Sequence, residues 1–197
     1  MPKGYPAEGQ PYPLILQLDG HAFEQLITPE MLDEMIEQEK FPPCVVVFLP
    51  PNGDRMLQYA CNDNFNEFLA IELIPELRDR FHCSTEAKDT FITGSSMGGL
   101  ASFYAGLTHP EVFGHVVSQS GALQLGREKI DQEIDKFIEK EGETHFVMDA
   151  GEFELGLFGN EVSLSAANDE RNEKMQDNEY MAPLYEYFVH DKNFVKM

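Results

Sequence analysis

The sequence predicts a single α/β domain, in which a mostly parallel β-sheet lies between two layers of helices. Short, near-continuous apolar runs alternate along the chain with longer segments whose apolar residues recur every three or four positions. The short runs suit strands buried on both faces, and their alternation with helices is typical of βαβ units. The 197 residues are enough for the core of such a three-layer sandwich. We therefore expect one domain over residues 1–197, with residues 1–12 as an N-terminal arm.

The first part of the chain contains two of these strands and a helix between them. Residues 13–18 and residues 44–49 are near-continuous apolar runs, which suit buried strands. Between them, Thr28 and Pro29 are residue types favoured at a helix N-cap and at the first helical position. The apolar face of this predicted helix consists of Met31, Leu32, Met35 and Ile36. Residues 41–43, with two prolines, end it.

A longer helix is predicted after residues 54–64, a loop without clear periodicity. The apolar residues that follow recur every four positions and lie on one helical face: Phe65, Leu69, Leu73, Leu77 and Phe81. Pro75 lies inside this pattern and lacks a backbone N–H, so we expect it to kink or split the helix.

The second half continues the alternation. Strands are predicted at residues 90–93, 112–118 and 145–149. One helix is predicted from Met97 to about His109, and a second amphipathic helix contains Ile130, Ile134, Phe137 and Ile138. In the tail we predict a helix over residues 169–177 and a last strand over residues 184–189.

The charge balance narrows the classes of function. Thirty-five Asp and Glu against fourteen Lys and Arg give a net charge of −21. A nucleic-acid partner is therefore not expected, because binding phosphate needs the opposite sign. Anionic substrates would also be repelled at long range, although a local positive pocket can override this within a Debye length. The favoured explanation of the acidity is simply solubility or a saline habitat.

The three cysteines, Cys44, Cys61 and Cys83, are far apart and lack the spacing of metal ligands. Two of them lie in apolar surroundings, so we expect buried free thiols rather than a disulfide framework, and no metal. We find no apolar run long enough to cross a membrane and no basic-then-apolar leader. A cytoplasmic protein without a membrane partner is therefore expected.

The segment from Gly94 to Gly98 fits the Gly-x-Ser-x-Gly pattern of a nucleophile elbow, with Ser96 at its centre. A serine at the tip of a tight strand-to-helix turn leaves no room for a Cβ two residues away on either side. The bare pattern would arise by chance in roughly one chain of this length in fifteen. A β-type apolar run before it and small residues after it favour the elbow, while a glycine-rich turn with a capping serine is the alternative.

A serine nucleophile needs a base and an acid that orients the base. In an elbow-bearing sheet these follow the serine in the order acid, histidine, on loops at the carboxyl ends of strands. His115 and His145 open predicted strands and so face the opposite end, whereas His190 directly follows the last candidate strand. The loop after residues 145–148 offers three candidate acids, with a merely solvated acidic loop as the alternative: Asp149, Glu152 and Glu154.

Backbone N–H groups are the expected oxyanion donors. One would come from Met97, at the start of the helix after Ser96. The second would come from His21 or Ala22, because Asp19-Gly20-His21 ends the first strand beside the elbow. A plain turn is the competing interpretation of that segment.

Several motifs together resemble the putative-esterase family, which includes esterase D, the mycolyltransferases, feruloyl esterases and the enterochelin (trilactone siderophore) esterases. The strand end Leu16-Gln17-Leu18-Asp19-Gly20 is similar to the family's LDG motif. The segment from Cys61-Asn62 to Leu73-Ile74-Pro75 is similar to the enterochelin-esterase branch. The elbow, the His109-Pro110-Glu111-Val112-Phe113 segment and Ser118-Gln119-Ser120-Gly121 continue the resemblance, which covers residues 12–123.

The resemblance implies an α/β-hydrolase fold and hydrolysis of a small-molecule ester through a serine acyl-enzyme, without a cofactor. By position, the family's acid falls on Glu154 and its histidine on His190, with Ser96 as the nucleophile. Arg55 matches a family arginine and is a candidate substrate contact, with a surface salt bridge as the equal alternative.

Some features depart from the family pattern. The two glycines expected before the histidine are absent, and Gln58 stands where a glutamate is usual. The chain also begins where relatives have already built one or two antiparallel edge strands, which would leave a sheet edge suited to a homodimer. Two alternatives to an ester hydrolase therefore stay open: an acyltransferase of the mycolyltransferase type, and a truncated relative that binds ligands without catalysis.

Overall fold

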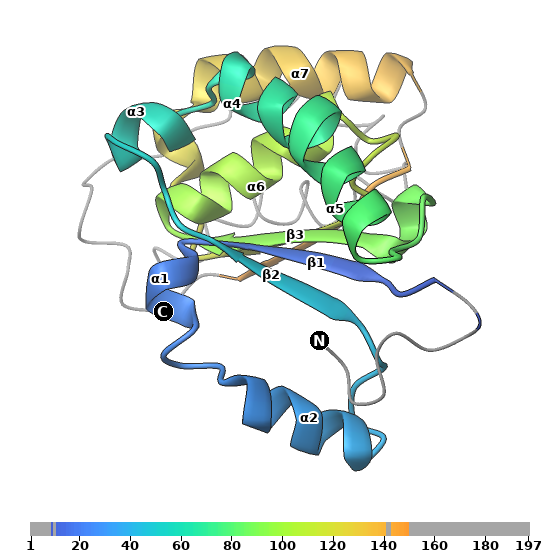
Figure 1. Cartoon of the computed structure of the whole chain (residues 1–197). Helices are drawn as coiled ribbons and strands as arrows, with labels where there is room; N and C mark the ends of the chain where they lie inside the picture. The colour runs from blue at the N-terminus through green and yellow to red at the C-terminus, as the bar shows by residue number, and fades with distance from the viewer. Residues whose placement is uncertain (1–8, 10, 141–142, 150–197) are drawn as a thin grey trace, which may run out of the picture.

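The computed structural model describes residues 9, 11–140 and 143–149, which form a parallel sheet with helices packed on it (Figure 1). The strands are β1 Leu14–Leu18, β2 Val45–Leu49, β3 Thr90–Ser95, β4 His115–Gln119 and β5 His145–Asp149. Their order across the sheet is β2-β1-β3-β4-β5, and every neighbouring pair is parallel. The prediction of an α/β fold with a mostly parallel sheet is confirmed.

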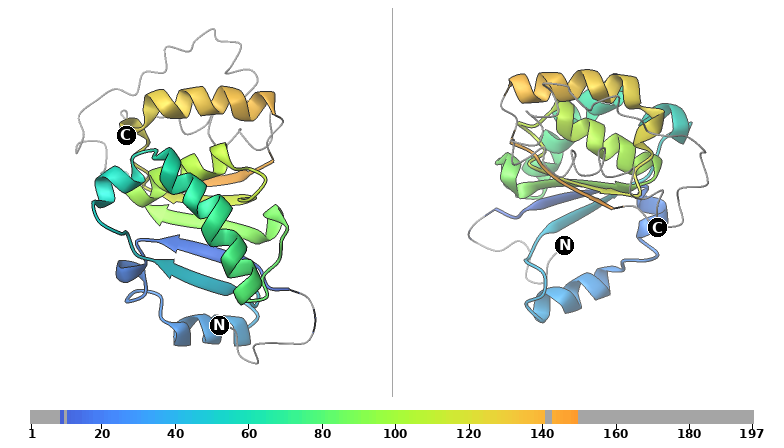
Figure 2. Two further views of the ribbon diagram at one scale, coloured as in Figure 1. Left: turned by 45° about the horizontal axis from the view of Figure 1, so that its top comes forward. Right: turned by 180° about the vertical axis from the view of Figure 1, so that it is seen from behind.

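Helices lie on both sides of this sheet (Figures 1 and 2). One side carries α3 Arg55–Tyr59, α4 Asp63–Glu67, α5 Ile74–Arg80, α6 Met97–Thr108 and α7 Arg127–Glu139. The other side carries α1 Gly20–Phe23 and α2 Pro29–Glu37. Short 3-10 helices span Ala87–Asp89 and Leu123–Leu125.

The core lies between the sheet and α6. Every residue of α6 from Met97 to Leu107 is buried, so this helix is enclosed on all sides. Gly106 lets it approach the sheet closely, because a Cβ there would fall 2.3 Å from a methyl carbon of Val116 on β4. Phe146 of β5 completes the contact, with its ring centroid 5.0 Å from that of Phe103.

The opposite face of the sheet carries a row of aromatic rings. Side chains alternate between the faces of a strand, so Phe91, His115 and His145, one residue before the core positions, point away from α6. These three residues are aligned across β3, β4 and β5, and their ring centroids are 4.3 and 5.1 Å apart. Burial, and then the neighbouring His145, lowers the pKa of His115. Both histidines open their strands, as predicted.

The helical segment predicted over residues 65–81 exists and is divided into separate elements just before Pro75. The chain passes from α4 through a π-helical stretch, Phe68–Leu73, directly into α5. Pro75 falls in the first turn of α5, where its missing N–H disturbs the helix least. The predicted split is therefore confirmed, and it takes the form of a change of helix type before Pro75.

Residues 54–64, predicted as a loop, contain α3. Five residues are too few to show a periodic apolar face, which is why the sequence pattern missed this helix. The Asp54 carboxylate caps it by accepting hydrogen bonds from the backbone N–H groups of Met56 and Leu57, at 2.9 and 3.2 Å. Asn62 caps α4 in the same way through the N–H of Phe65.

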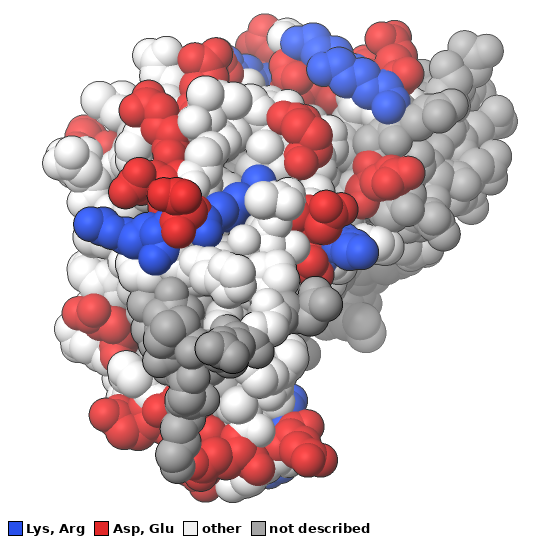
Figure 3. All heavy atoms as spheres, turned by 45° about the vertical axis from the view of Figure 1, so that its right-hand side comes forward, with Lys and Arg blue, Asp and Glu red and all other residues white. Residues whose placement is uncertain are grey.

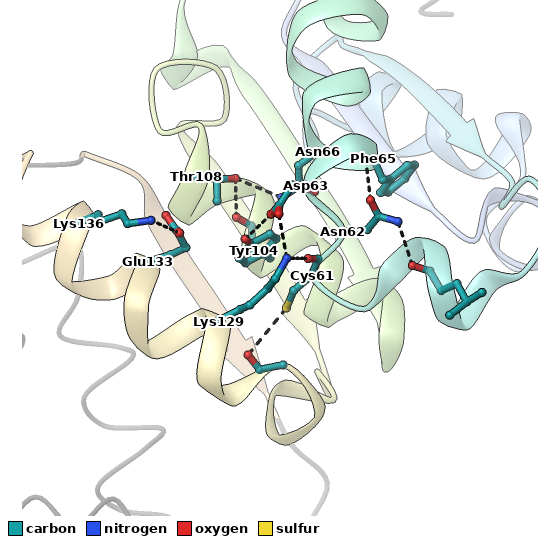
Figure 4. A network of polar contacts seen from close by, with 12 residues as sticks. Cys61, Asn62, Asp63, Phe65, Asn66, Tyr104, Thr108, Lys129, Glu133 and Lys136 are labelled. Carbon is teal, nitrogen blue, oxygen red and sulfur yellow. Dashed lines mark hydrogen bonds and ion pairs between the residues drawn. The ribbon is translucent and has the colours of Figure 1, made fainter.

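Polar contacts tie α4, α6 and α7 together over the core (Figure 4). The Lys129 ammonium group on α7 reaches both the carbonyl oxygen of Cys61 and the carboxylate of Asp63, each at 2.9 Å. Asn66 donates a 3.1 Å hydrogen bond to the hydroxyl of Thr108 at the end of α6. These contacts hold α4 in place, and α4 follows the α3 segment described below.

Within the described residues, no helix is both long and apolar enough to cross a membrane. On the face of the molecule drawn in Figure 3, Lys and Arg side chains lie among Asp and Glu side chains and do not gather into a basic patch. The predicted helix over residues 169–177 and strand over residues 184–189 lie outside the described residues.

Candidate active site

Ser96 occupies the tip of the turn between β3 and α6. Its backbone has φ 55° and ψ −115°, a strained conformation for a residue with a Cβ, of a kind that clusters at active sites. Neighbouring backbone holds it there. The Ser96 N–H donates to the carbonyl oxygen of Gln119 at 2.9 Å, and the N–H of Ala122 donates to the Ser96 carbonyl oxygen at 3.0 Å. Ser96 is exposed, although Met97 beside it is buried.

The hydroxyl group of Ser96 is not used to cap α6. Ser96 stands at the N-cap position, but its side chain makes no capping hydrogen bond. The alternative of a glycine-rich turn with a capping serine is therefore wrong. The N–H groups in the first turn of a helix lack intrahelical partners, and the helix dipole adds positive potential there. The Met97 N–H belongs to this first turn, and its role as an oxyanion donor stays a prediction.

The second loop at this edge follows β1 and contains Asp19, Gly20 and His21. Asp19 is in the left-handed region at φ 55°, and α1 begins directly after it. The N–H of Ala22 donates to the Asp19 carbonyl oxygen at 2.9 Å. Of the two residues considered as second oxyanion donor, Ala22 is therefore already engaged, and His21 is the better candidate.

Gly20 sets the position of this loop against the sheet. A Cβ on Gly20 would lie 2.3 Å from the carbonyl carbon of Phe48 and 2.5 Å from the nitrogen of Leu49. Because these are backbone atoms of β2, they cannot move aside cheaply. Glycine is required here, which explains the Asp-Gly pair at the end of the first strand.

Arg55 on α3 binds Asp19 through a bidentate ion pair. The Nε–Oδ1 and Nη2–Oδ2 distances are both 2.6 Å, and this hydrogen bonding raises the pKa of Arg55. The Asp19 side chain is 8% exposed and that of Arg55 33%. The guanidinium carbon lies 5.2 Å from the ring centroid of Tyr59, whose hydroxyl accepts a 3.3 Å hydrogen bond from the Asp19 N–H.

The sequence indicates Arg55 as a candidate but does not indicate its partners Asp19 and Tyr59. A substrate contact and a salt bridge are equal interpretations of Arg55 from the sequence, and the structure shows a salt bridge to Asp19. The substrate contact stays a prediction. The sequence signal for the Asp19–Arg55 ion pair is weak. It consists of an acidic residue at the end of one predicted strand and an arginine after the next strand, 36 positions later.

Two of the predicted catalytic residues, Glu154 and His190, lie outside the described residues, as does the alternative acid Glu152. Asp149 is the last residue of β5, and its carboxylate accepts a 2.8 Å hydrogen bond from the N–H of Ser120. Asp149 thus lies at the carboxyl edge of the sheet, two strands from the elbow.

A cavity of about 610 Å³ opens near this edge but does not contain Ser96. Its lining comes from the end of β2, the loop after it, α3, and the start of the following helices: Leu49, Pro50, Asn52, Asp54, Leu57, Gln58, Asn62, Phe65 and Phe68. Of its polar groups, the Gln58 oxygen already accepts from the Asn52 N–H. Among the described residues, no group of three or more His, Cys, Asp and Glu side chains is arranged to hold a metal ion.

Comparison with known proteins gives one consistent family. A family model described as "Putative esterase" matches residues 1–181. The iron(III) enterobactin esterase of Escherichia coli (strain K12) is 34% identical over 119 residues, which are 59% of this chain and 30% of that protein. The chain thus spans about a third of the length of the enterobactin esterases that it matches.

Solved structures agree with this. The enterobactin esterase FES from Shigella flexneri, crystallised in the presence of enterobactin, has a TM-score of 0.59 and 29% identity. The match covers 71% of this chain and 38% of that one. The BES protein from Bacillus cereus has a TM-score of 0.60 at 20% identity, over 74% of this chain and 64% of that one, and its likeness concerns the fold alone.

Proposed function

The chain belongs to the putative esterase family and has the α/β-hydrolase fold, and from this premise we propose that it hydrolyses carboxylic esters with Ser96 as the nucleophile. The observation that carries the proposal is the state of Ser96. It is exposed at the start of a buried helix, held in a strained conformation, and its side chain makes no capping hydrogen bond. A serine at the N-cap position usually has an unstrained backbone and caps the helix with its side chain. Ser96 does neither, which is consistent with a catalytic role.

In the proposed reaction, the Ser96 hydroxyl oxygen attacks the ester carbonyl carbon while its proton passes to a general base. The resulting oxyanion would accept hydrogen bonds from the N–H groups of Met97 and His21. As this intermediate collapses, the base returns the proton to the leaving oxygen, so the alcohol departs and an acyl group stays on Ser96. Water, deprotonated by the same base, then attacks the acyl carbon, which releases the acid and restores the Ser96 hydroxyl. We assign the base to His190 and its orienting acid to Glu154, on the chain order and the family resemblance.

The substrate class that we propose is a siderophore-type ester. Support comes from the named activity of the relatives, which are iron(III) enterobactin esterases. The net charge of −21 would repel an anionic ferric complex at long range. The proposed site therefore accepts the neutral ester more readily than its charged iron complex. The 610 Å³ cavity beside α3, rich in apolar side chains, is large enough for an aromatic or acyl group.

The experiment compares hydrolysis of p-nitrophenyl acetate and butyrate by the wild type and by the Ser96→Ala and His190→Ala variants. Ser102→Ala, which removes a buried hydroxyl elsewhere on the same helix, is the matched control. We expect Ser96→Ala and His190→Ala to lose at least about a thousandfold in kcat and Ser102→Ala to retain activity. Mass spectrometry of quenched reactions should find an acyl group on the wild-type protein and none on the Ser96→Ala variant.

Three other results would each change the proposal. Activity that needs Ser96 but survives His190→Ala would show that another group is the base. Turnover that rises when an alcohol acceptor replaces water would favour the acyltransferase alternative. A wild type without turnover of these esters or of enterobactin itself, and without acylation of Ser96, would overturn the proposal and favour a binding protein.

A further inference from the structure

A single guanidinium group joins the two loops that would form the oxyanion site. Arg55 binds both carboxylate oxygens of Asp19, at the start of the β1–α1 loop. The same Nη2 atom also donates to the carbonyl oxygen of Ser95, at 3.4 Å, one residue before the nucleophile. The β1–α1 loop and the elbow follow neighbouring strands that pair directly, and Arg55 on α3 adds a side-chain link between them beyond the ends of those strands.

Asp19 is held through its backbone as well as its side chain. Its N–H donates to the hydroxyl of Tyr59, which is completely buried and therefore a fixed point. Its carbonyl oxygen accepts from Ala22 in the first turn of α1. The N–H of His21 lies within this turn, so its direction follows from how α3 anchors Asp19.

The Asp19 carboxylate also lies close to the helix that carries the nucleophile. A Cβ on Gly98 would fall 2.8 Å from Asp19 Oδ2, so this oxygen rests against the first turn of α6. A negative charge here acts on the same N–H groups and helix dipole that would stabilise an oxyanion at Met97. Without a cation beside it, a nearly buried carboxylate at this position would oppose formation of the oxyanion.

We propose that Arg55 is a positioning residue for ester hydrolysis, which fixes the His21 N–H opposite that of Met97 and neutralises Asp19 beside the oxyanion. The inference rests on the proposed function. It gives Arg55 a role that does not depend on the substrate's charge, in contrast to a direct contact with substrate. A positioning role lowers kcat on a small neutral ester, whereas a substrate contact mainly raises KM on substrates that reach it.

The test measures kcat and KM on p-nitrophenyl acetate for Arg55→Met, Asp19→Asn and the double variant Asp19→Asn/Arg55→Met. Arg80→Met, at an exposed arginine on α5, is the matched control. Arg55→Met should lower kcat about 10- to 100-fold with little change in KM, because the loop shifts and the Asp19 charge is unpaired. The double variant should be several-fold faster than Arg55→Met, because the opposing charge is gone.

An effect of Arg55→Met on KM alone would overturn the proposal, as would a double variant no faster than Arg55→Met. Arg55→Lys covers the case in which Arg55→Met fails to fold. Lysine keeps the charge but cannot form the two-pronged contact, so it should lose less kcat than Arg55→Met and still fall below the wild type. Wild-type kcat in Arg55→Lys would exclude a role for the bidentate geometry.

Amide hydrogen exchange gives a readout that does not need enzyme activity. In Arg55→Met, backbone amides of residues 19–23 should exchange faster, while those of α7 should not change. Unchanged exchange in residues 19–23 would overturn the proposal, whatever the kinetics show. If the wild type had no esterase activity, the proposed function would fail, and exchange would still decide whether Arg55 anchors this loop.

Discussion

The hydroxyl group of Tyr104, on the central helix α6, lies 2.7 Å from a carboxylate oxygen of Asp63 on α4 and donates a hydrogen bond to it. The other carboxylate oxygen accepts from Lys129 on α7, so one carboxylate joins three helices (Figure 4). The hydrogen bond from Tyr104, and then that from Lys129, lowers the pKa of Asp63. Burial, and then the bond to Asp63, raises the pKa of Tyr104.

The first prediction concerns this carboxylate. Asp63→Asn should destabilise the protein at about pH 7 by about 1 kcal/mol, a modest loss because the Asp63 side chain is 64% exposed. Since the folded-state pKa lies below the ordinary value, the stabilisation is present above that value and is lost as pH falls through the folded pKa. Urea unfolding in neutral and in acidic solution should therefore show a difference between wild type and variant that shrinks as the pH falls below the ordinary range of a carboxyl group.

The exposed Asp79 on α5 supplies the control for this experiment, because Asp79→Asn removes a carboxylate of equal charge from the same acidic protein. It should leave stability nearly unchanged at both pH values. An Asp63→Asn cost that stays the same at low pH would show that the ionised carboxylate is not what stabilises the three-helix contact.

A second prediction separates the elbow from the rest of α6. A Cβ on Gly94 would fall 2.5 Å from both the carbonyl carbon and the carbonyl oxygen of Gly98. Because these are backbone atoms at the start of α6, they cannot move aside cheaply. Gly94→Ala should therefore reduce stability by about 3 kcal/mol and remove most esterase activity, because Ser96 is displaced. Thermal unfolding and kcat on p-nitrophenyl acetate measure the two effects.

Gly106→Ala is the comparison, because it also adds a methyl group at a closely packed glycine, but on α6 and against side chains of β4 and β5 rather than against the elbow backbone. It should cost stability and leave kcat near the wild-type value in the folded fraction. Equal loss of kcat in both variants would mean that the activity reports only on folding and that the Gly94–Gly98 contact has no special role.

The sequence predicted the strands well because a strand buried on both faces leaves an unbroken apolar run. β1 and β2 were each placed within one residue, and β3 was extended by two residues into the elbow. The fourth strand was placed over 112–118 but begins at His115, because Val112 and Phe113 are buried in the turn before it. Apolar character alone cannot separate a buried turn from a strand.

The site was only partly predictable, for a related physical reason. The tight turn at Ser96 was predictable because its neighbouring glycines are a local steric requirement, and the catalytic role of Ser96 stays a prediction. The Asp19–Arg55–Tyr59 contacts were not found, because they join a strand end to a five-residue helix without periodicity. Such long-range polar contacts leave no pattern in a single sequence. The predictions for Glu154 and His190 fall outside the described residues and stay predictions.

A third prediction uses an unsatisfied hydroxyl group. Ser102 lies inside α6 and is completely buried, and its hydroxyl has no hydrogen-bond partner among the described residues. Burying an unpaired hydroxyl costs free energy, and alanine is the better helix former. Ser102→Ala should raise the free energy of unfolding by about 0.5 to 1 kcal/mol, measured by urea denaturation. A loss of stability would instead reveal a hydrogen bond to this hydroxyl.

The last prediction concerns the three cysteines, which are all free and buried, as the sequence analysis expected. Burial raises the pKa of Cys44 and Cys83 to about 11 and that of Cys61 to about 12. The thiolate is the reactive form, so at about pH 8 each folded thiol should react with a disulfide reagent about two orders of magnitude more slowly than an exposed cysteine. In concentrated guanidinium chloride the protein is unfolded, so all three thiols should react quickly, with three equivalents of reagent consumed per chain. This reaction provides the control. A thiol that reacts fast in the folded protein would identify a cysteine exposed by local opening, and alanine substitution at each position in turn would locate it.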